Sequence, residues 1–283
     1  MAEASIRPAH AEDVESAYGV LAACDLGPWY DLTLEQFRAG WPAYRGTWLA
    51  EEGSVVGFAA ARSDEVEAYV VPEARRRGIG TRLLAEAEAR AEEPRVTAMA
   101  RRDEAAAAPF LGRHGYRAGS EVWLMQTDLD REPPEPVWPD GIAVRSFRVE
   151  EARAVKELLD IAYAKEPDFR LRPFEDWSRF MLGDASLFDP DCWFVAESED
   201  GSLAGAALNW KEAYVKDLVV HPSQRGRGLG TALLRHTFRY FKDRGFPQVT
   251  LKTDSLNTSR AWRLYEREGM RKTRTYDIFE KEL

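Results

Sequence analysis

The sequence contains few of the residues on which several classes of protein depend. Its two cysteines, Cys24 and Cys192, lie far apart and match no disulfide or metal-binding spacing. Its four histidines are scattered, so no local motif offers a zinc site or a Ser-His-Asp arrangement. We therefore expect no metal centre, and so few cysteines are typical of the reducing cytoplasm.

Positive charge and long apolar runs are also scarce. There are 39 basic and 48 acidic residues, a net charge of −9, and both signs are mixed along the chain. This balance argues against a surface that binds nucleic acid. No apolar run approaches the roughly 20 residues of a membrane span, and the polar stretch Met1 to His10 does not resemble a signal peptide. We expect a cytoplasmic protein that binds neither nucleic acid nor membranes, and no pattern indicates its oligomeric state.

Against these absences stands a glycine-rich turn between a predicted strand and a predicted helix. The apolar run that ends at Val220 is broken by Pro222, and apolar positions recur at helical spacing from Leu229. Glycines allow backbone N–H groups to converge there, and the positive end of a helix favours a phosphate. The anion site predicted from this pattern comprises Arg225, Gly226, Arg227, Gly228, Leu229, Gly230 and Thr231.

Two common phosphate motifs do not fit this turn. It lacks the Gly-Lys-Ser/Thr ending of a Walker loop, and its spacing differs from the dinucleotide GxGxxG. It resembles the Arg/Gln-x-x-Gly-x-Gly loop of the GNAT superfamily of N-acetyltransferases, with Arg225, Gly228 and Gly230 in the signature places. The resemblance implies that acetyl-CoA is the acyl donor, with its pyrophosphate in the loop and its acyl and pantetheine groups along the backbone of Leu218, Val219 and Val220. An ordinary glycine-containing strand-to-helix turn is the alternative.

The first half of the chain carries its own copy of this stretch. Pro72 and Pro222, Gly78 and Gly228, and Gly80 and Gly230 are each separated by 150 positions. By resemblance, the cofactor-binding residues of this copy are Val70, Val71, Arg75, Arg76, Arg77, Gly78, Ile79, Gly80 and Thr81.

A repeat of such length indicates tandem domains. We predict an N-terminal GNAT-like domain over 1–130, a proline-rich linker over 131–141 and a catalytic C-terminal GNAT domain over 142–283. The expected fold class is α/β, in which each domain has a mixed, mostly antiparallel twisted sheet flanked by helices. The predicted strands are 5–7, 48–50, 55–61, 65–71, 96–100, 121–129, 144–146, 192–197, 202–210, 214–220, 249–253 and 273–280, and the helices are 12–23, 80–91, 105–113, 149–163, 229–241 and 255–267.

A second motif occurs only in the second copy. The string Asn257 to Met270 resembles the second cofactor motif of the family, which implies that Asn257 and Arg260 contact the cofactor and that Tyr265 is the general acid. A phenol suits that role because it can protonate the thiolate that leaves a thioester. A core tyrosine is the alternative. The first copy has Leu111 opposite Tyr265, so we expect it to be structural or to bind CoA without turnover.

A general base must accept the proton of the acceptor amine. Asp217 is the first candidate because similar enzymes often place a carboxylate on this strand, and Glu212 and His221 are held in reserve. A solvated carboxylate at a strand end explains Asp217 equally well.

The acceptor is identified only as a class, a small-molecule amine or a peptide N-terminus. The family places its substrate wall in the stretch that corresponds to Lys165–Asp191. This stretch contains seven acidic residues and four basic ones. This excess faintly favours a cationic amine, although a solvated acidic helix explains it as well.

These features predict N-acetyl transfer from acetyl-CoA by direct attack of a primary amine. One alternative follows from the two-copy organisation, which is similar to that of mycothiol synthase, an enzyme that acetylates a cysteinyl amine on an amino sugar. The other alternative is a non-catalytic acyl-CoA sensor.

Overall fold

The computed structural model describes residues 3–24, 34–166 and 169–283. Its packing divides the chain into two compact units, one of residues 1–120 with 276–283 and the other of residues 121–275. The limits 1–130 and 142–283 stay a prediction for the two sequence copies. The packed units differ from those limits because the copies exchange strands, as described below.

The first unit is built on an antiparallel sheet in the order β1-β2-β3-β4. The buried residues of β3 pack beneath α3 on one face and α1 on the other. Its elements are β1 (Ser5–Pro8), α1 (Val14–Ala23), α2 (Leu34–Gly40), β2 (Gly46–Glu51), β3 (Val55–Ala61), β4 (Val66–Val70), α3 (Ile79–Glu88), β5 (Arg95–Arg101) and α4 (Ala107–Arg113).

The second unit repeats this order of elements, and its first three helices are longer than those of the first unit. It contains β7 (Ile142–Ser146), α5 (Ala152–Tyr163), α6 (Phe174–Leu182), β8 (Phe194–Ser198), β9 (Leu203–Trp210), β10 (Tyr214–Val220), α7 (Leu229–Asp243), β11 (Gln248–Asp254) and α8 (Trp262–Arg267). The sheet order is β7-β8-β9-β10-β11, antiparallel except for the parallel pair β10–β11. The expected mixed, mostly antiparallel sheet flanked by helices is confirmed.

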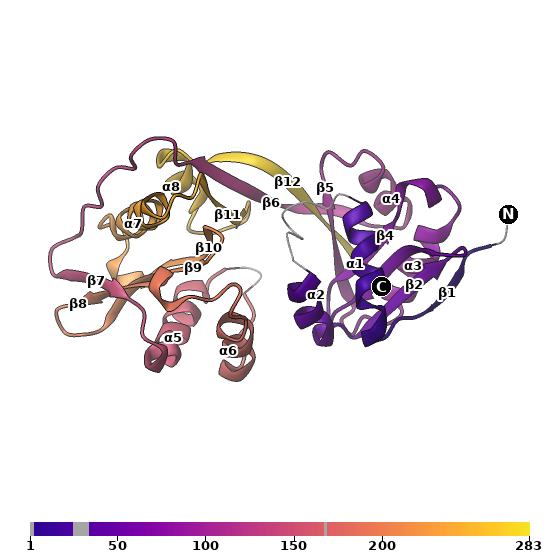
Figure 1. Cartoon of the computed structure of the whole chain (residues 1–283), viewed down its shortest axis with the longest axis horizontal. Helices are drawn as coiled ribbons and strands as arrows, with labels where there is room; N and C mark the ends of the chain where they lie inside the picture. The colour runs from indigo at the N-terminus through magenta and orange to yellow at the C-terminus, as the bar shows by residue number, and fades with distance from the viewer. Residues whose placement is uncertain (1–2, 25–33, 167–168) are drawn as a thin grey trace. The chain divides into compact units, whose positions relative to one another are not determined.

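Strand β9 is buried on both faces because helices cover both. Ala206 and Leu208 pack with α5 and the end of α7, whereas Ala204 and Ala207 pack beneath Leu229 and Leu233 of α7. In Figure 1, α5 and α6 lie on one side of β8–β10 and α7 on the other. A strand covered on both faces reads as a continuous apolar run, as this one does.

The strands that end the two copies are exchanged. Strand β6 (Arg117–Asp128) comes from the first half of the chain, yet residues 122–128 pair with the whole of β11 in the second unit. Strand β12 (Arg271–Glu282) is the last of the chain, yet residues 276–282 pair with β5 in the first unit. Strand 121–129 was predicted within the N-terminal domain, but its residues 122–128 pair in the second unit, because propensity locates a strand without selecting its neighbour.

One helix prediction was also wrong in part. Residues 255–261 were expected to begin a helix that ends at 267, but α8 begins only at Trp262. Asn257 turns its side-chain oxygen back onto the chain, where it accepts from Ala261 N at 3.4 Å, and Arg260 has a φ of +53°. Such local bonding competes with helix formation, so a loop precedes α8. Among the described residues, no helix is long and apolar enough to cross a membrane.

Candidate active site

The candidate site lies where β10 and β11 separate. The two strands pair only at Tyr214–Thr250 and Val215–Leu251 and then diverge, which opens a cavity of about 680 Å³ in the second unit. The predicted site residues that line it are Asp217, Leu218, Val219, Val220, Arg225, Gly226, Gly228, Leu229, Gly230, Thr231, Asn257, Arg260 and Tyr265. One cavity therefore joins two motifs that begin 32 residues apart in the chain, at Arg225 and Asn257.

The glycine loop forms one wall of this cavity. Gly228 is the N-cap of α7 with φ +87° and ψ 0°, and Gly226 has φ +77°, a region that favours glycine. A Cβ added at either position would meet no atom within 4 Å, so the space above the loop is open. The first N–H groups of a helix have no partner within the helix. The loop therefore offers an uncovered set of donors at the positive end of α7.

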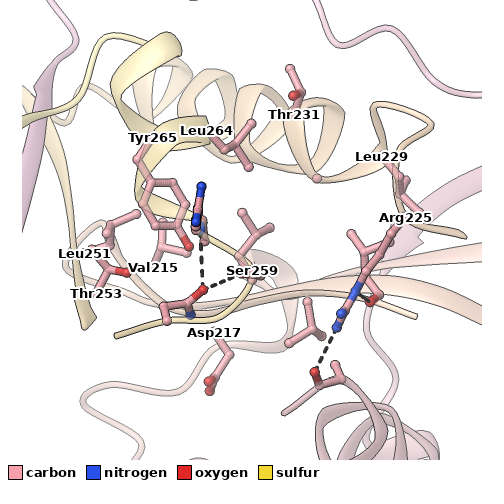
Figure 2. A pocket seen from close by; sticks show the side chains of 18 of the residues that line it. Val215, Asp217, Arg225, Leu229, Thr231, Leu251, Thr253, Ser259, Leu264 and Tyr265 are labelled. Atoms are coloured by element: carbon pink, nitrogen blue, oxygen red, sulfur yellow. Dashed lines mark hydrogen bonds between the residues drawn. The ribbon is translucent and has the colours of Figure 1, made fainter. Parts of the chain in front are cut away.

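The two arginines of the glycine loop hold the shape of the loop more than they supply positive charge to the cavity. Arg225 donates to the carbonyls of Val220, at 3.2 Å, and of Ala162, at 2.8 Å, and so joins β10 to the end of α5 (Figure 2). Arg227 bonds to the Gln224 side chain and to the carbonyl of Asp140, at 2.8 Å, and it does not line the cavity. Binding of an anion here would depend first on backbone N–H groups.

Tyr265 and Asp217 lie at the same end of the cavity, away from Arg225 and Leu229 (Figure 2). Tyr265, on α8, has only 7% of its surface exposed, and burial followed by the charge of Asp217 raises the pKa of its phenol. Asp217 follows a β-bulge between Val215 and Asp217 where the register with β9 shifts, and bulges often re-aim a side chain. A phenol that keeps its proton thus faces the same cavity as a carboxylate.

Sequence reasoning missed the side chain that contacts Asp217. The hydroxyl of Tyr163, at the end of α5, donates to Asp217 Oδ1 at 3.0 Å. In the sequence Tyr163 was only the last position of an amphipathic helix, and no motif marks it. Glu166 was missed in the same way; it accepts from the backbone N–H of Thr258 at 2.8 Å and from its hydroxyl at 2.9 Å.

The reserve bases and the acceptor wall lie differently from expectation. Neither Glu212 nor His221 lines the cavity, and the His221 ring instead caps the turn at Ser223. Of the aromatic residues in 165–191, Trp177 packs in the core, whereas Phe180 is exposed over Trp210. Several of the acidic side chains there bond to immediate neighbours, as Asp184 does to Ser186, which favours the structural explanation of that acidic stretch.

The first copy retains the loop with more of its groups occupied. Gly78 has φ +80° as the N-cap of α3, and Arg76 has φ +67° at the position that corresponds to Gly226. Arg75 pairs with Glu104 at 3.2 Å, and Arg77 with Glu52 at 2.7 Å. Thr81 contacts His114 at 3.0 Å. Leu111, aligned with Tyr265, is buried in the core.

No group of three or more metal-ligating side chains occurs within residues 3–24, 34–166 and 169–283.

Both halves of the chain match family models. Residues 152–270 match the Acetyltransferase (GNAT) family, and residues 43–118 match an Acetyltransferase (GNAT) domain. Mycothiol acetyltransferase of Thermomonospora curvata is 32% identical over 270 residues, which cover 86% of this chain and 84% of the relative. That of Acidothermus cellulolyticus is 32% identical over 256 residues, 82% of this chain and 77% of the relative.

Solved structures agree on the architecture. A GCN5-related N-acetyltransferase from Sphaerobacter thermophilus superposes with a TM-score of 0.80 at 28% identity, over 100% of this chain and 96% of that chain. A tandem GNAT protein from the clavulanic acid biosynthesis pathway has a TM-score of 0.75 at 21% identity, over 99% and 98% of the two chains. The latter likeness concerns the fold alone.

Proposed function

This chain is a tandem acetyltransferase of the GNAT family, and we propose that its second copy transfers the acetyl group of acetyl-CoA to a primary amine by direct attack. The observation that carries the proposal is the single cavity that joins the glycine loop of α7 to Tyr265 and Asp217. It combines an anion-binding end with an acid–base end.

The residues present fit acetyl-CoA. The first turn of α7 and the left-handed Gly226 and Gly228 form an open cradle of N–H donors suited to a pyrophosphate. Leu218–Val220 line the next part of the cavity, where the parallel pairing with β11 has ended. Asn257 and Arg260 also line the cavity. Bound acetyl-CoA would supply the activated acetyl thioester.

Each of the two titratable groups has one role in the proposed mechanism. Tyr265 keeps its proton because burial and the charge of Asp217 raise its pKa, so it can donate to a departing thiolate. Asp217 is proposed to take a proton from the acceptor ammonium, directly or through water, which leaves the neutral amine to attack the thioester carbonyl. Its Oδ2 lies 3.5 Å from Lys216 Nζ.

The relatives suggest which amine to test first. Three relatives that are 30–32% identical over 81–86% of this chain are named mycothiol acetyltransferases. We therefore propose the cysteinyl amine of the mycothiol precursor as the leading acceptor, and a simple primary amine or a peptide N-terminus as the broader class.

The test is an acceptor panel with acetyl-CoA. Because a cysteinyl acceptor carries its own thiol, product should be measured by mass spectrometry, with free-thiol release used only for thiol-free amines. An acetylated product whose formation needs the intact protein and disappears in Tyr265→Phe supports the proposal. Tight binding of acetyl-CoA without product from any amine, and without thioester hydrolysis, would favour the acyl-CoA sensor.

The first copy is proposed to bind CoA more weakly than the second, without turnover. Its loop keeps the helix N-terminus, but Arg75 and Arg77 must exchange carboxylate partners to meet a phosphate. Leu111 cannot donate a proton.

A further inference from the structure

The strongest unassigned feature is the contact between Tyr163 and Asp217. Tyr163 ends α5, 54 residues before Asp217 on β10, and its hydroxyl reaches Oδ1 at 3.0 Å. Both side chains line the cavity. Neither of the motifs that identify the family includes Tyr163.

The two carboxylate oxygens of Asp217 have different neighbours. Oδ1 accepts from Tyr163 on α5, while Oδ2 lies 3.5 Å from Lys216 Nζ on β10 itself. Burial raises the pKa of Tyr265 on α8 and of Tyr214 on β10, and the nearby charge of Asp217 raises the pKa of both phenols further. The remaining charged side chains lining the cavity are Glu166 on the α5 side, Arg225, Lys252, Asp254, Arg260 and Arg267.

Tyr163 acts as a donor in this arrangement. Burial, and then the charge of Asp217, raise the pKa of its phenol well above 10, so the hydroxyl keeps its proton. A carboxylate bound to a donor is favoured in its charged form. The Asp217 carboxylate also has less freedom to rotate, because Tyr163 fixes Oδ1. Oδ2 is then left toward Lys216 and the cavity.

We propose that Tyr163 is a positioning residue that holds the Asp217 carboxylate in one orientation, with Oδ1 occupied by the phenol and Oδ2, beside Lys216, left to receive the proton of the acceptor ammonium. This inference rests on the proposed role of Asp217 as the base. It predicts a function for the end of α5, which would then contribute to proton transfer as well as to the fold.

The test is the pH profile of kcat/KM for Tyr163→Phe, measured with acetyl-CoA and a reactive amine. Loss of the donor favours the neutral carboxyl, so the acid limb should move up by roughly one to two pH units. Relative to wild type, the rate of Tyr163→Phe should be lowest at acid pH, and it should recover toward the wild-type value at alkaline pH. The affinity for acetyl-CoA should not change, because Tyr163 does not belong to the glycine loop.

Tyr214→Phe is the matched control. Tyr214 is a half-buried phenol that also feels the charge of Asp217, but within the described part of the chain it makes no hydrogen bond to that carboxylate. The acid limb of the Tyr214→Phe profile should therefore stay in place. In the Asp217→Asn background, Tyr163→Phe should have no further effect on the profile, because coupled residues are not additive.

Two outcomes separate this inference from the proposed function. An inactive Asp217→Asn with an unmoved acid limb in Tyr163→Phe overturns the positioning role alone. A fully active Asp217→Asn with the wild-type profile removes the base and the positioning role together. If Tyr163→Phe folds poorly, 3-fluorotyrosine at position 163 replaces it: the more acidic phenol is a stronger donor, so the limb should move down, and an unmoved limb would again overturn the positioning role.

Discussion

Replacing Tyr265 with phenylalanine tests the centre of the proposed chemistry. The substitution removes one hydroxyl and keeps the ring, which packs in the core cluster of the second unit with 7% of its surface exposed. Because the ring contacts are retained, we expect the fold and the acetyl-CoA affinity to stay close to wild type. Only the proton donor at the Asp217 end of the cavity is lost.

The expected loss of rate follows from the role assigned to the phenol. A positioned proton transfer contributes about 10²–10⁴-fold, so kcat should fall by that factor, equivalent to about 2.7–5.4 kcal/mol of barrier. The KM for acetyl-CoA should change little, since the loss concerns a group needed in the transition state. Product should be followed by mass spectrometry under saturating amine, with acetyl-CoA affinity measured by calorimetry.

The pH dependence gives a second reading of the same residue. Burial raises the pKa of Tyr265 above its ordinary value of 10, so the phenol stays protonated through that pH. Deprotonation of Tyr265 should therefore cause no fall in the wild-type kcat near pH 10. Any fall in that range should also be present in Tyr265→Phe. Tyr240→Phe, on α7 and packed against Phe194, provides a phenol-to-phenyl control outside the cavity. Near wild-type turnover in Tyr265→Phe would move the acid to another group.

Four further outcomes are expected. Gly228→Ala should weaken acetyl-CoA binding, because φ +87° costs an alanine about 1–2 kcal/mol and the loop must distort; Gly245→Ala, at φ +79° in open space outside the cavity, should lose stability without losing affinity, and equal affinity in both variants would argue against the loop site. In a Gly228→Trp protein, whose bulky side chain fills the open space above the second loop, acetyl-CoA should still raise the melting temperature at high concentration through the first copy, whereas no rise would show that copy to be empty. The arginine partner of Asp13 lowers the pKa of that carboxyl from 3.8 to about 2, so Asp13→Asn should lose stability at neutral pH, and thermal melts should show the difference vanish between about pH 4 and pH 2; a difference that persists below that window would contradict the ion pair as its cause. The separate fragment 131–283 should be poorly soluble on its own because β11 loses its neighbour, and co-expression with 1–130 should recover soluble complex, a result that a well-folded, monomeric 131–283 would contradict.

The parts of the fold that could be predicted from sequence are those with local signals. The loop of Gly226 and Gly228 was located because positive φ at a helix N-terminus selects glycine, and the repeat doubled that signal at a spacing of 150. The predicted strands on either side of Gly53 and of Gly201 could be separated for a similar reason, since both glycines have positive φ.

The parts that sequence could not supply depend on contacts between distant segments. Tyr163 reaches Asp217 only because α5 packs beside β10, and the two residues are 54 positions apart in the chain. Arg225 was assigned to the cofactor from its place in the loop, whereas its guanidinium bonds to the end of α5, at Ala162. In the loop before α8, the competition between helix propensity and the side-chain bond of Asn257 is decided by the local backbone, which a periodic pattern does not record.

Through the strand exchange, the first half of the chain supports the candidate site. The cavity exists because β11 separates from β10, so β11 must be held from its other side. That neighbour is β6, which pairs along all seven residues of β11 and contributes Met125 to the core cluster that also contains Tyr265 and Leu251. The first half of the chain therefore supplies one structural wall of the second half's site. Selection on the site would preserve β6, and with it the half that delivers the strand, even where Leu111 offers no chemistry.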